Sequence, residues 1–97
     1  MPTYITLYRW TQAGAEQIKD SPARLDAAKQ AMRSAGVELK GFYLTMGQYD
    51  MVAVWEAPDD ETWARAALAL GAKGSVRSET LRAFTEEEYR RIVAALP

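Results

Sequence analysis

The stretch that most constrains the fold of this chain is residues 41–58, which reads as two strands joined by a tight turn. From residue 51 onward the side chains alternate, so that Val52 and Val54 share one face of a strand. The sequence G-Q-Y-D at 47–50 supplies the turn, because glycine adopts positive φ easily and aspartate is a common turn residue. We therefore predict a hairpin made of strands at 37–44 and 50–56.

The rest of the chain adds a strand at 4–10, a strand at 76–84, and apolar residues at helical spacing in two segments. Gly36 and Gly71 mark the ends of those two helices, and Thr85 with Glu88 forms a capping box that opens a last helix. The order β-α-β-β-α-β-α predicts a single α+β domain over residues 1–97. It is the ferredoxin-like plan, a four-stranded antiparallel sheet with two helices on one face, plus a C-terminal helix.

Composition excludes several classes of function. The 97 residues carry a net charge of −1 with both signs interspersed, whereas nucleic-acid binding needs a basic stripe. The chain has no cysteine and no histidine, which removes thiol chemistry, the commonest general base and the commonest transition-metal ligand. The acids at 59–61 are ordinary helix-start residues without calcium-loop spacing, so no metal and no cofactor are predicted. No apolar run approaches membrane-spanning length, and a cytoplasmic protein that binds no membrane is the expectation.

Alternation along the predicted strands sorts their side chains onto two faces of the sheet. We expect the helix-covered face to be aliphatic, built from Ile5, Leu7, Phe42, Val52, Val54 and Leu81. The opposite, open face then collects Tyr4, Thr6, Tyr8, Trp10, Tyr43, Met51, Trp55, Ser78, Thr80 and Arg82. So many aromatic side chains on an open face are typical of an interaction surface. Two copies packed face to face would bury it, which predicts a homodimer shaped as a dimeric α+β barrel.

Two interpretations of that aromatic face stay open. Its residues either form only the core of the dimer interface, or also line a cavity between sheet and partner that binds a small molecule. The predicted ligand-binding residues are Tyr4, Tyr8, Trp10, Tyr43, Trp55, Thr80 and Arg82. Arg77 and Arg82 alternate to opposite faces, and the register of the last strand decides which of them faces the cavity. An arginine there either binds an anionic group or forms a salt bridge with an acid such as Glu79.

The turn at 47–50 and the last strand hold the candidates for acid–base catalysis, Tyr49, Asp50 and Glu79. Asp50 would need a strongly raised pKa to act near neutral pH, and that requires burial. The alternative, which these residue types favour, is a structural turn. In that case Asp50 accepts backbone N–H bonds and Tyr49 packs on a neighbour.

Six separated segments make the chain resemble the GYD-domain family, which is named for a Gly-Tyr-Asp signature. They are residues 1–4, 18–22, 40–43 leading into G-Q-Y-D at 47–50, 56–60, 76–77 and 80–85. The chain departs from the family pattern at Ser75, where asparagine is expected before Val76 and Arg77. The resemblance implies a dimeric α+β barrel fold and no established activity.

Three functions remain in view from the sequence. The first is a homodimeric accessory protein, or a higher oligomer, that binds a small molecule in the aromatic-lined cavity. The second is a cofactor-free oxygenase or isomerase, supported only by analogy of fold. The third is a purely structural oligomerisation module. Whether the protein is an enzyme is therefore left open.

Overall fold

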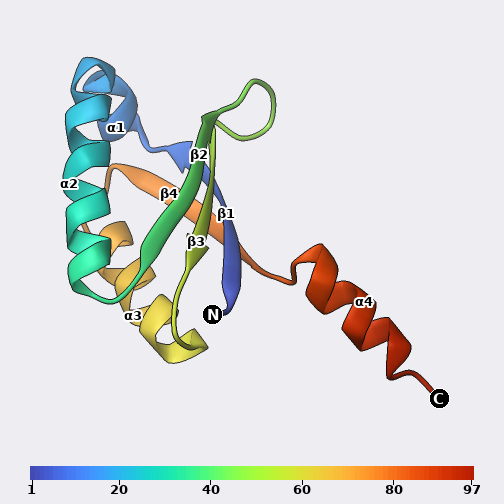
Figure 1. Ribbon diagram of the computed structural model, residues 1–97. Coiled ribbons are helices and arrows are strands. Elements are labelled where there is room, and N and C mark those ends of the chain that lie inside the picture. The colour runs from blue at the N-terminus through green and yellow to red at the C-terminus, as the bar shows by residue number, and fades with distance from the viewer.

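The computed structural model describes all 97 residues, Met1–Pro97, and has the predicted order of elements (Figure 1). The strands β1 (Thr3–Trp10), β2 (Glu38–Leu44), β3 (Met51–Glu56) and β4 (Val76–Ala83) form one antiparallel sheet. Their spatial order is β2-β3-β1-β4. The predicted α+β class is confirmed, and the order fits the ferredoxin-like plan.

The helices α2 (Ser21–Ser34) and α3 (Asp60–Gly71) cover one face of the sheet. A short helix α1 (Gln12–Glu16) and a 3₁₀ turn η1 (Ile18–Asp20) lead from β1 into α2. The last helix, α4 (Glu86–Ala94), leaves the end of β4 and projects away from the rest of the molecule (Figure 1). Its projection gives the molecule a longest dimension of 52 Å and a radius of gyration of 14.7 Å. A compact chain of this length has a radius of about 12.5 Å.

The predicted ends of elements have their expected local causes. Gly36 follows α2 at φ +88° and Gly47 lies in the hairpin turn at φ +114°, both in the left-handed region that glycine tolerates. Thr85 and Glu88 form the predicted capping box at the start of α4, each side chain bonded to the other's backbone N–H.

The prediction of which face the helices cover is wrong, since the two faces are exchanged. Tyr4 and Trp55 are each only 2% exposed and lie beneath the helices, together with Thr6, Tyr8, Met51 and Ala53. The aliphatic residues expected there lie on the face that no helix covers, where Leu81 is 51% exposed. The grouping of residues by alternation in β1, β3 and β4 holds, because Tyr4 pairs with both Trp55 and Arg82.

Strand β2 departs from simple alternation because of a bulge. The pairing with β3 shifts between Leu39 and Gly41, so that Phe42 lies opposite Ala53 and Tyr43 opposite Val52. One extra residue reverses the side to which every later side chain of the strand points. Phe42 therefore joins the aromatic residues under the helices. Tyr43, at 62% exposure, joins the aliphatic residues on the opposite face.

Alanine-rich helix stripes explain why the aromatic face is the covered one. Ala28 of α2 and Ala66 and Ala67 of α3 lie against the sheet, where their small side chains leave space that large partners fill. The aromatic rings of the sheet supply that volume. Trp63 of α3 joins them, stacking on Tyr4 with ring centroids 5.0 Å apart.

We call the uncovered side of the sheet the bare face. Its centre is mostly aliphatic, with one tyrosine on the edge strand, and its residues are Ile5, Leu7, Tyr43, Val52, Val54 and Leu81. Arg9, Arg77 and Glu79 lie on the same face toward one end. Ile5, Leu7, Val52 and Val54 are half-buried by their neighbours within the sheet, and Tyr43 and Leu81 are exposed. No helix of this chain packs on this face (Figure 1). The bare face is thus an apolar surface with a charged margin.

Candidate functional site

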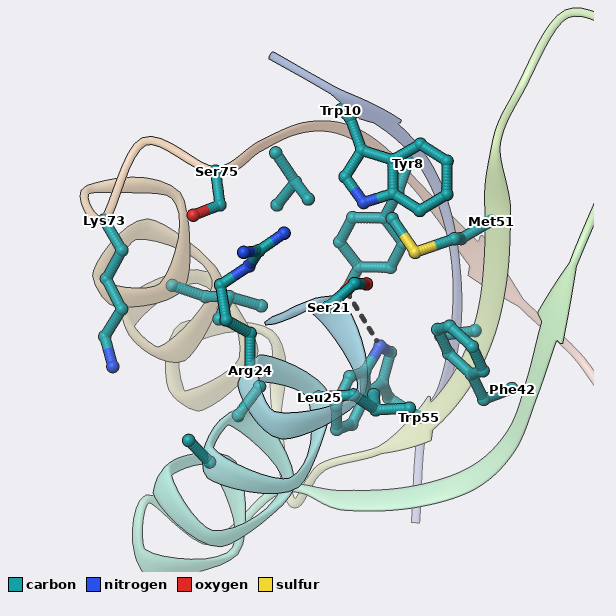
Figure 2. Close-up of a pocket in the computed structure, with 15 residues that line it drawn as sticks. Tyr8, Trp10, Ser21, Arg24, Leu25, Phe42, Met51, Trp55, Lys73 and Ser75 are labelled. Atoms are coloured by element: carbon teal, nitrogen blue, oxygen red, sulfur yellow. Dashed lines mark hydrogen bonds between the residues drawn. The ribbon is translucent and has the colours of Figure 1, made fainter. Parts of the chain in front are cut away.

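A cavity of about 150 Å³ lies between the sheet and the helices α2 and α3 (Figure 2). Its floor is the aromatic face of the sheet, and its walls come from the two helices and the loop before β4. The lining residues are Tyr8, Trp10, Ser21, Arg24, Leu25, Ala27, Ala28, Phe42, Met51, Ala53, Trp55, Leu70, Lys73, Ser75 and Val76. The small helix residues that admit the aromatic rings also leave this space unfilled.

Two polar atoms of the cavity floor are paired with each other. The Trp55 indole N–H donates to the Tyr8 phenol oxygen at 3.2 Å, within the buried core (Figure 2). Burial raises the pKa of Tyr8, and the hydrogen bond from Trp55 opposes that rise in part. The phenol therefore stays neutral at physiological pH, so the floor of the cavity is uncharged.

The rim of the cavity is built by docking α1 onto the loop before β4. The backbone N–H of Thr11 donates to the Ser75 carbonyl at 3.1 Å, and the Thr11 hydroxyl donates to the Gly74 carbonyl at 2.6 Å. Gly14 lies so close that a Cβ atom there would be 2.1 Å from the Ser75 oxygen. Arg24 completes the rim by donating to the backbone carbonyls of Gln17 at 2.8 Å and Gly14 at 3.2 Å.

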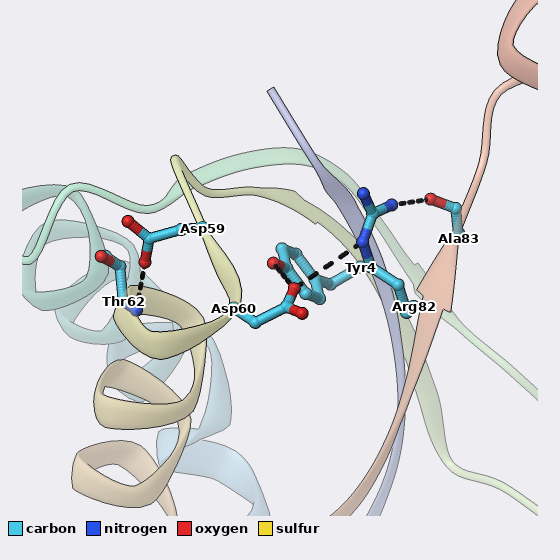
Figure 3. Close-up of polar contacts among 6 residues, drawn as sticks. All are labelled: Tyr4, Asp59, Asp60, Thr62, Arg82 and Ala83. Carbon is cyan, nitrogen blue, oxygen red and sulfur yellow. Dashed lines mark hydrogen bonds and ion pairs between the residues drawn. The ribbon is translucent and has the colours of Figure 1, made fainter.

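A second polar cluster lies outside the cavity, where α3 begins (Figure 3). The Tyr4 phenol donates to the Asp60 carboxylate at 2.5 Å, and Arg82 pairs with the same carboxylate at 3.7 Å. Burial and the hydrogen bond to Asp60 raise the pKa of Tyr4 to about 12. Arg82 also lies over the rings of Tyr4 and Phe84, at 5.6 and 4.6 Å from their centroids. These contacts tie α3 to the sheet.

The G-Q-Y-D turn is tied to the end of β1 by its aspartate. The Asp50 carboxylate accepts the backbone N–H of Trp10 at 3.0 Å, and the Asp50 N–H donates to the Tyr8 carbonyl at 2.8 Å. Thr45 closes the base of the turn by donating its hydroxyl to the Tyr49 carbonyl at 2.7 Å. The geometry is that of the structural alternative, in which Asp50 accepts a backbone N–H.

The other two catalytic candidates meet beside this turn. The Tyr49 phenol donates to the Glu79 carboxylate at 3.0 Å, and the Arg9 guanidinium lies 4.7 Å from the Tyr49 ring centroid. The hydrogen bond to Glu79 is the main cause of a raised pKa at Tyr49, which keeps the phenol protonated. The contacts of Tyr49 with Glu79 and Arg9 are those of the structural alternative, in which Tyr49 packs on its neighbours. These three residues lie at the margin of the bare face.

The seven predicted ligand-binding residues are divided among four places. Tyr8, Trp10 and Trp55 line the cavity, on the helix-covered side instead of between the sheet and a partner. Tyr4 and Arg82 belong to the cluster with Asp60. Thr80 lies exposed on the edge strand β4, on the helix-covered side, and Tyr43 lies on the bare face. The register of β4 places Arg82 on the covered face and Arg77 on the bare face.

The sequence prediction does not include the cavity residues that come from helices and loops. Leu25 and Leu70 fit ordinary core stripes, Lys73 belongs to no motif, and Ser75 stands out only as a departure from the family pattern. The one available signal is Arg24, which precedes Ala28 by one helical turn on a side that is otherwise apolar. No group of three or more acidic residues is placed to hold a metal ion. None of the helices combines the length and the apolar character that crossing a membrane requires.

Comparisons with known proteins agree over nearly the whole chain. Residues 4–93 match the GYD domain family. A Thermus thermophilus protein named glutamine synthetase and cystathionine beta-lyase binding protein is 43% identical over 85 residues, 87% of this chain and 90% of that one. The crystal structure of TTHA0845, also from Thermus thermophilus, aligns with a TM-score of 0.55 and 26% identity, covering 88% of this chain and 95% of that one. The family match extends from β1 into α4 and includes the sheet, the cavity and the turn.

Proposed function

The chain belongs to the GYD domain family, and on that premise we propose that it is a homodimeric accessory protein that works by binding metabolic enzymes. The observation that carries the proposal is the amount of apolar surface that the chain leaves uncovered on its bare face and on α4. The name of the Thermus thermophilus relative supports enzymes as the class of partner, since it is called a binding protein for two of them. The cytoplasmic location expected from the sequence stays a prediction.

The bare face is assigned to a second copy of the chain. A two-fold axis brings the same patch of both copies together, so the patch must complement itself. The aliphatic centre meets that requirement, because Leu7 and Val54 of one copy can pack on the same residues of the other. The margin carries both signs of charge, with Arg77 and Glu79 on one strand, so opposite charges can meet across the axis.

The helix α4 is assigned to the enzyme partner. It is amphipathic, with Tyr89, Ile92 and Val93 between 46% and 60% exposed, and Leu96, just beyond its end, is 66% exposed. Its opposite side is polar and carries the ion pair of Glu86 with Arg90 at 2.9 Å. Nine residues are marginal as an isolated helix in water, so a partner groove that receives the apolar stripe would stabilise it.

Purified proteins test this function and separate its two surfaces. The wild-type chain is expected to sediment as a dimer and to bind glutamine synthetase or cystathionine beta-lyase of its own host in calorimetry. Val54→Lys, on the bare face, should give a monomer. Ile92→Asp should keep the dimer and lose the enzyme, while Arg90→Gln, on the polar side of α4, should keep both. A wild-type monomer that binds neither enzyme would overturn the proposal.

A second candidate function is the binding of a small molecule, and the cavity under the helices supports it. Cavities with aromatic walls and a few polar groups are the usual sites of such ligands. Native mass spectrometry of protein purified from its own host measures a retained mass, which Ala28→Phe should remove by filling the cavity. If wild type and variant carry the same mass, the cavity does not hold the ligand. The enzymatic alternative and the purely structural role gain no specific observation and stay predictions.

A further inference from the structure

The cavity has an apolar interior with room for a body the size of one ring. Eleven of its 15 lining residues are hydrophobic, and its volume is about 150 Å³. In another protein an engineered apolar cavity of about this volume stays free of water and binds benzene. A ligand that fills the present cavity therefore has an apolar body of roughly that size.

The charged residues of the cavity are of one sign. Arg24 and Lys73 are its only charged lining residues, and neither forms an ion pair with an acid of this chain. In Figure 2 the Arg24 guanidinium lies between Ser21 and Ser75, whereas the Lys73 side chain lies further out with its ammonium directed away. An apolar cavity with an unneutralised cation at its mouth is complementary to an amphipathic anion.

Arg24 is held in place while part of its hydrogen-bonding capacity remains free. Two of its nitrogens donate to the carbonyls of Gly14 and Gln17, which are neutral acceptors. A guanidinium has five N–H groups, so the fork retains donors after these two bonds. Fixing the side chain in advance reduces the conformational entropy that binding an anion would cost.

We propose that this cavity binds a small organic carboxylate, with its apolar body on Tyr8, Trp10 and Trp55 and its carboxylate on Arg24. The guanidinium fork matches a carboxylate in geometry and in charge. The inference deepens the small-molecule function proposed above and rests on it. It is independent of the enzyme-binding proposal, because none of the residues that line the cavity belongs to the bare face or to α4.

The three tryptophans provide a built-in test by nuclear magnetic resonance of the ¹⁵N-labelled full chain. Trp10 and Trp55 line the cavity, whereas Trp63 does not and serves as the internal reference. Benzoate at neutral pH should shift the indole N–H signals of Trp10 and Trp55 in a saturable way and should move Trp63 less. Benzamide has nearly the same shape without the charge. Its affinity should be at least about tenfold weaker, since a charge-assisted hydrogen bond contributes about 1.5–3 kcal/mol.

Variants of single residues connect the effect to Arg24. Arg24→Gln should lower the affinity for benzoate about tenfold or more and leave that for benzamide nearly unchanged. Arg65→Gln removes the same charge from an exposed site on α3, where the partner is Glu61, and should change neither affinity. Ala28→Phe fills the cavity and should abolish both. Arg24→Lys keeps the charge and should recover part of the benzoate affinity. If Arg24→Gln lowers the affinity only by disturbing the rim of the cavity, the lysine variant, which also loses the hydrogen bonds of the guanidinium, should show no such recovery.

The outcomes separate this inference from the function on which it rests. Equal affinities for benzamide and benzoate would overturn the inference that the ligand is a carboxylate, while the proposal that the cavity binds a small molecule would stand. If phenylphosphonate binds more tightly than benzoate, the inference of a carboxylate is likewise overturned, because the preferred anion is then a phosphoryl group. If benzoate, phenylacetate, hexanoate and benzamide all leave the Trp10 and Trp55 signals in place, the carboxylate inference and the small-molecule function fall together.

Discussion

Thr6 places a hydroxyl group in the centre of the core. Its side chain is 1% exposed, and its Oγ1 atom has no partner in normal hydrogen-bond geometry, although its proximity to the Tyr8 phenol opposes part of the rise in pKa that burial causes there. An unpaired buried hydroxyl costs free energy, because water that solvates it in the unfolded chain is not replaced in the folded protein. Thr6→Val keeps the shape and removes this cost, so it should raise the free energy of unfolding by about 1 kcal/mol.

Urea denaturation measures that change as a higher midpoint at an unchanged m-value. The matched control is Thr80→Val, because Thr80 pairs with Thr6 across β1 and β4 but is exposed to solvent. Its hydroxyl loses no solvation on folding, and the substitution should be close to neutral. Destabilisation by Thr6→Val would mean that the hydroxyl is paired in solution.

The phenol of Tyr4 should make the stability of the protein depend on alkaline pH. Its pKa rises from 10.0 to about 12 on folding, because burial and the bond to Asp60 favour the neutral form. The stabilisation that follows is complete below the unfolded pKa and is lost as pH rises through the folded pKa. The free energy of unfolding should therefore fall from about pH 10 to pH 12.

Tyr4→Phe removes this titration together with the hydrogen bond to Asp60. The variant should be less stable than wild type at neutral pH, and its unfolding free energy should fall less steeply in the alkaline range. Tyr89→Phe, which changes an exposed phenol on α4, should keep the wild-type profile. Parallel alkaline limbs in wild type and Tyr4→Phe would contradict the assignment.

At the scale of elements, α1 is held to the loop before β4 by a close approach at Gly14. A Cβ atom there would lie 2.1 Å from the Ser75 carbonyl oxygen, so one backbone must move. Alanine is the better helix former by about 1 kcal/mol, but the clash should outweigh that gain. Gly14→Ala should lower the free energy of unfolding by roughly 1–3 kcal/mol.

The matched substitution at the other helix separates the two effects. Gly71 ends α3 without a positive φ, and a Cβ atom there meets nothing within 4 Å. The free energy of unfolding of Gly71→Ala should therefore change only through the higher helix propensity of alanine, and it should rise by up to about 1 kcal/mol. Thermal unfolding of both variants measures the difference. A Gly14→Ala protein as stable as wild type would show that α1 does not need this contact.

The order of the elements was predictable because the signals that set it are local. Alternation marked β1, β3 and β4, and Gly36, Gly47 and Thr85 marked ends and turns at their observed places. Which face of the sheet the helices cover was not predictable from the sequence. Both faces of β1 carry apolar or aromatic side chains, and alternation alone does not show which of them turns toward the helices. The deciding feature is the complementarity between alanine-rich helices and large rings, which is a property of the packed pair.

The candidate site was predictable only in part, for the same reason. Tyr8, Trp10 and Trp55 were identified as cavity residues, but the other wall was expected from a partner chain. That wall is built by α2, α3 and the loop before β4, which meet through tertiary packing and share no sequence motif. Phe42 lies on the helix-covered face and Tyr43 on the uncovered face, as predicted, whereas the residues of the other strands lie on the faces opposite to those predicted. The cause of this difference is a bulge of one residue in β2, which leaves no clear mark in the sequence.

At the scale of the whole molecule, two apolar surfaces remain without a partner in a chain of 97 residues. A domain this small buries a limited share of its surface, so covering the bare face adds much to its stability. The uncovered apolar surface of the bare face is therefore one of the observations that support the proposed dimer. The dimer that we propose has the face-to-face geometry predicted from the sequence, but its meeting faces would be the aliphatic ones, because the aromatic residues belong to the core of the single chain.

A dimer held by its bare faces should unfold at a temperature that depends on protein concentration. Mass action favours the folded dimer, so each tenfold increase in concentration should raise the Tm by roughly 3–6 °C. Val54→Lys places a charge in the aliphatic centre and should abolish that dependence as well as lowering the Tm. Leu68→Lys is the control, because Leu68 lies on α3 and is 76% exposed. It should keep the slope of wild type in scanning calorimetry. A wild-type Tm that stays constant from micromolar to millimolar concentration would exclude a homodimer coupled to folding, and the bare face would then have to receive another protein.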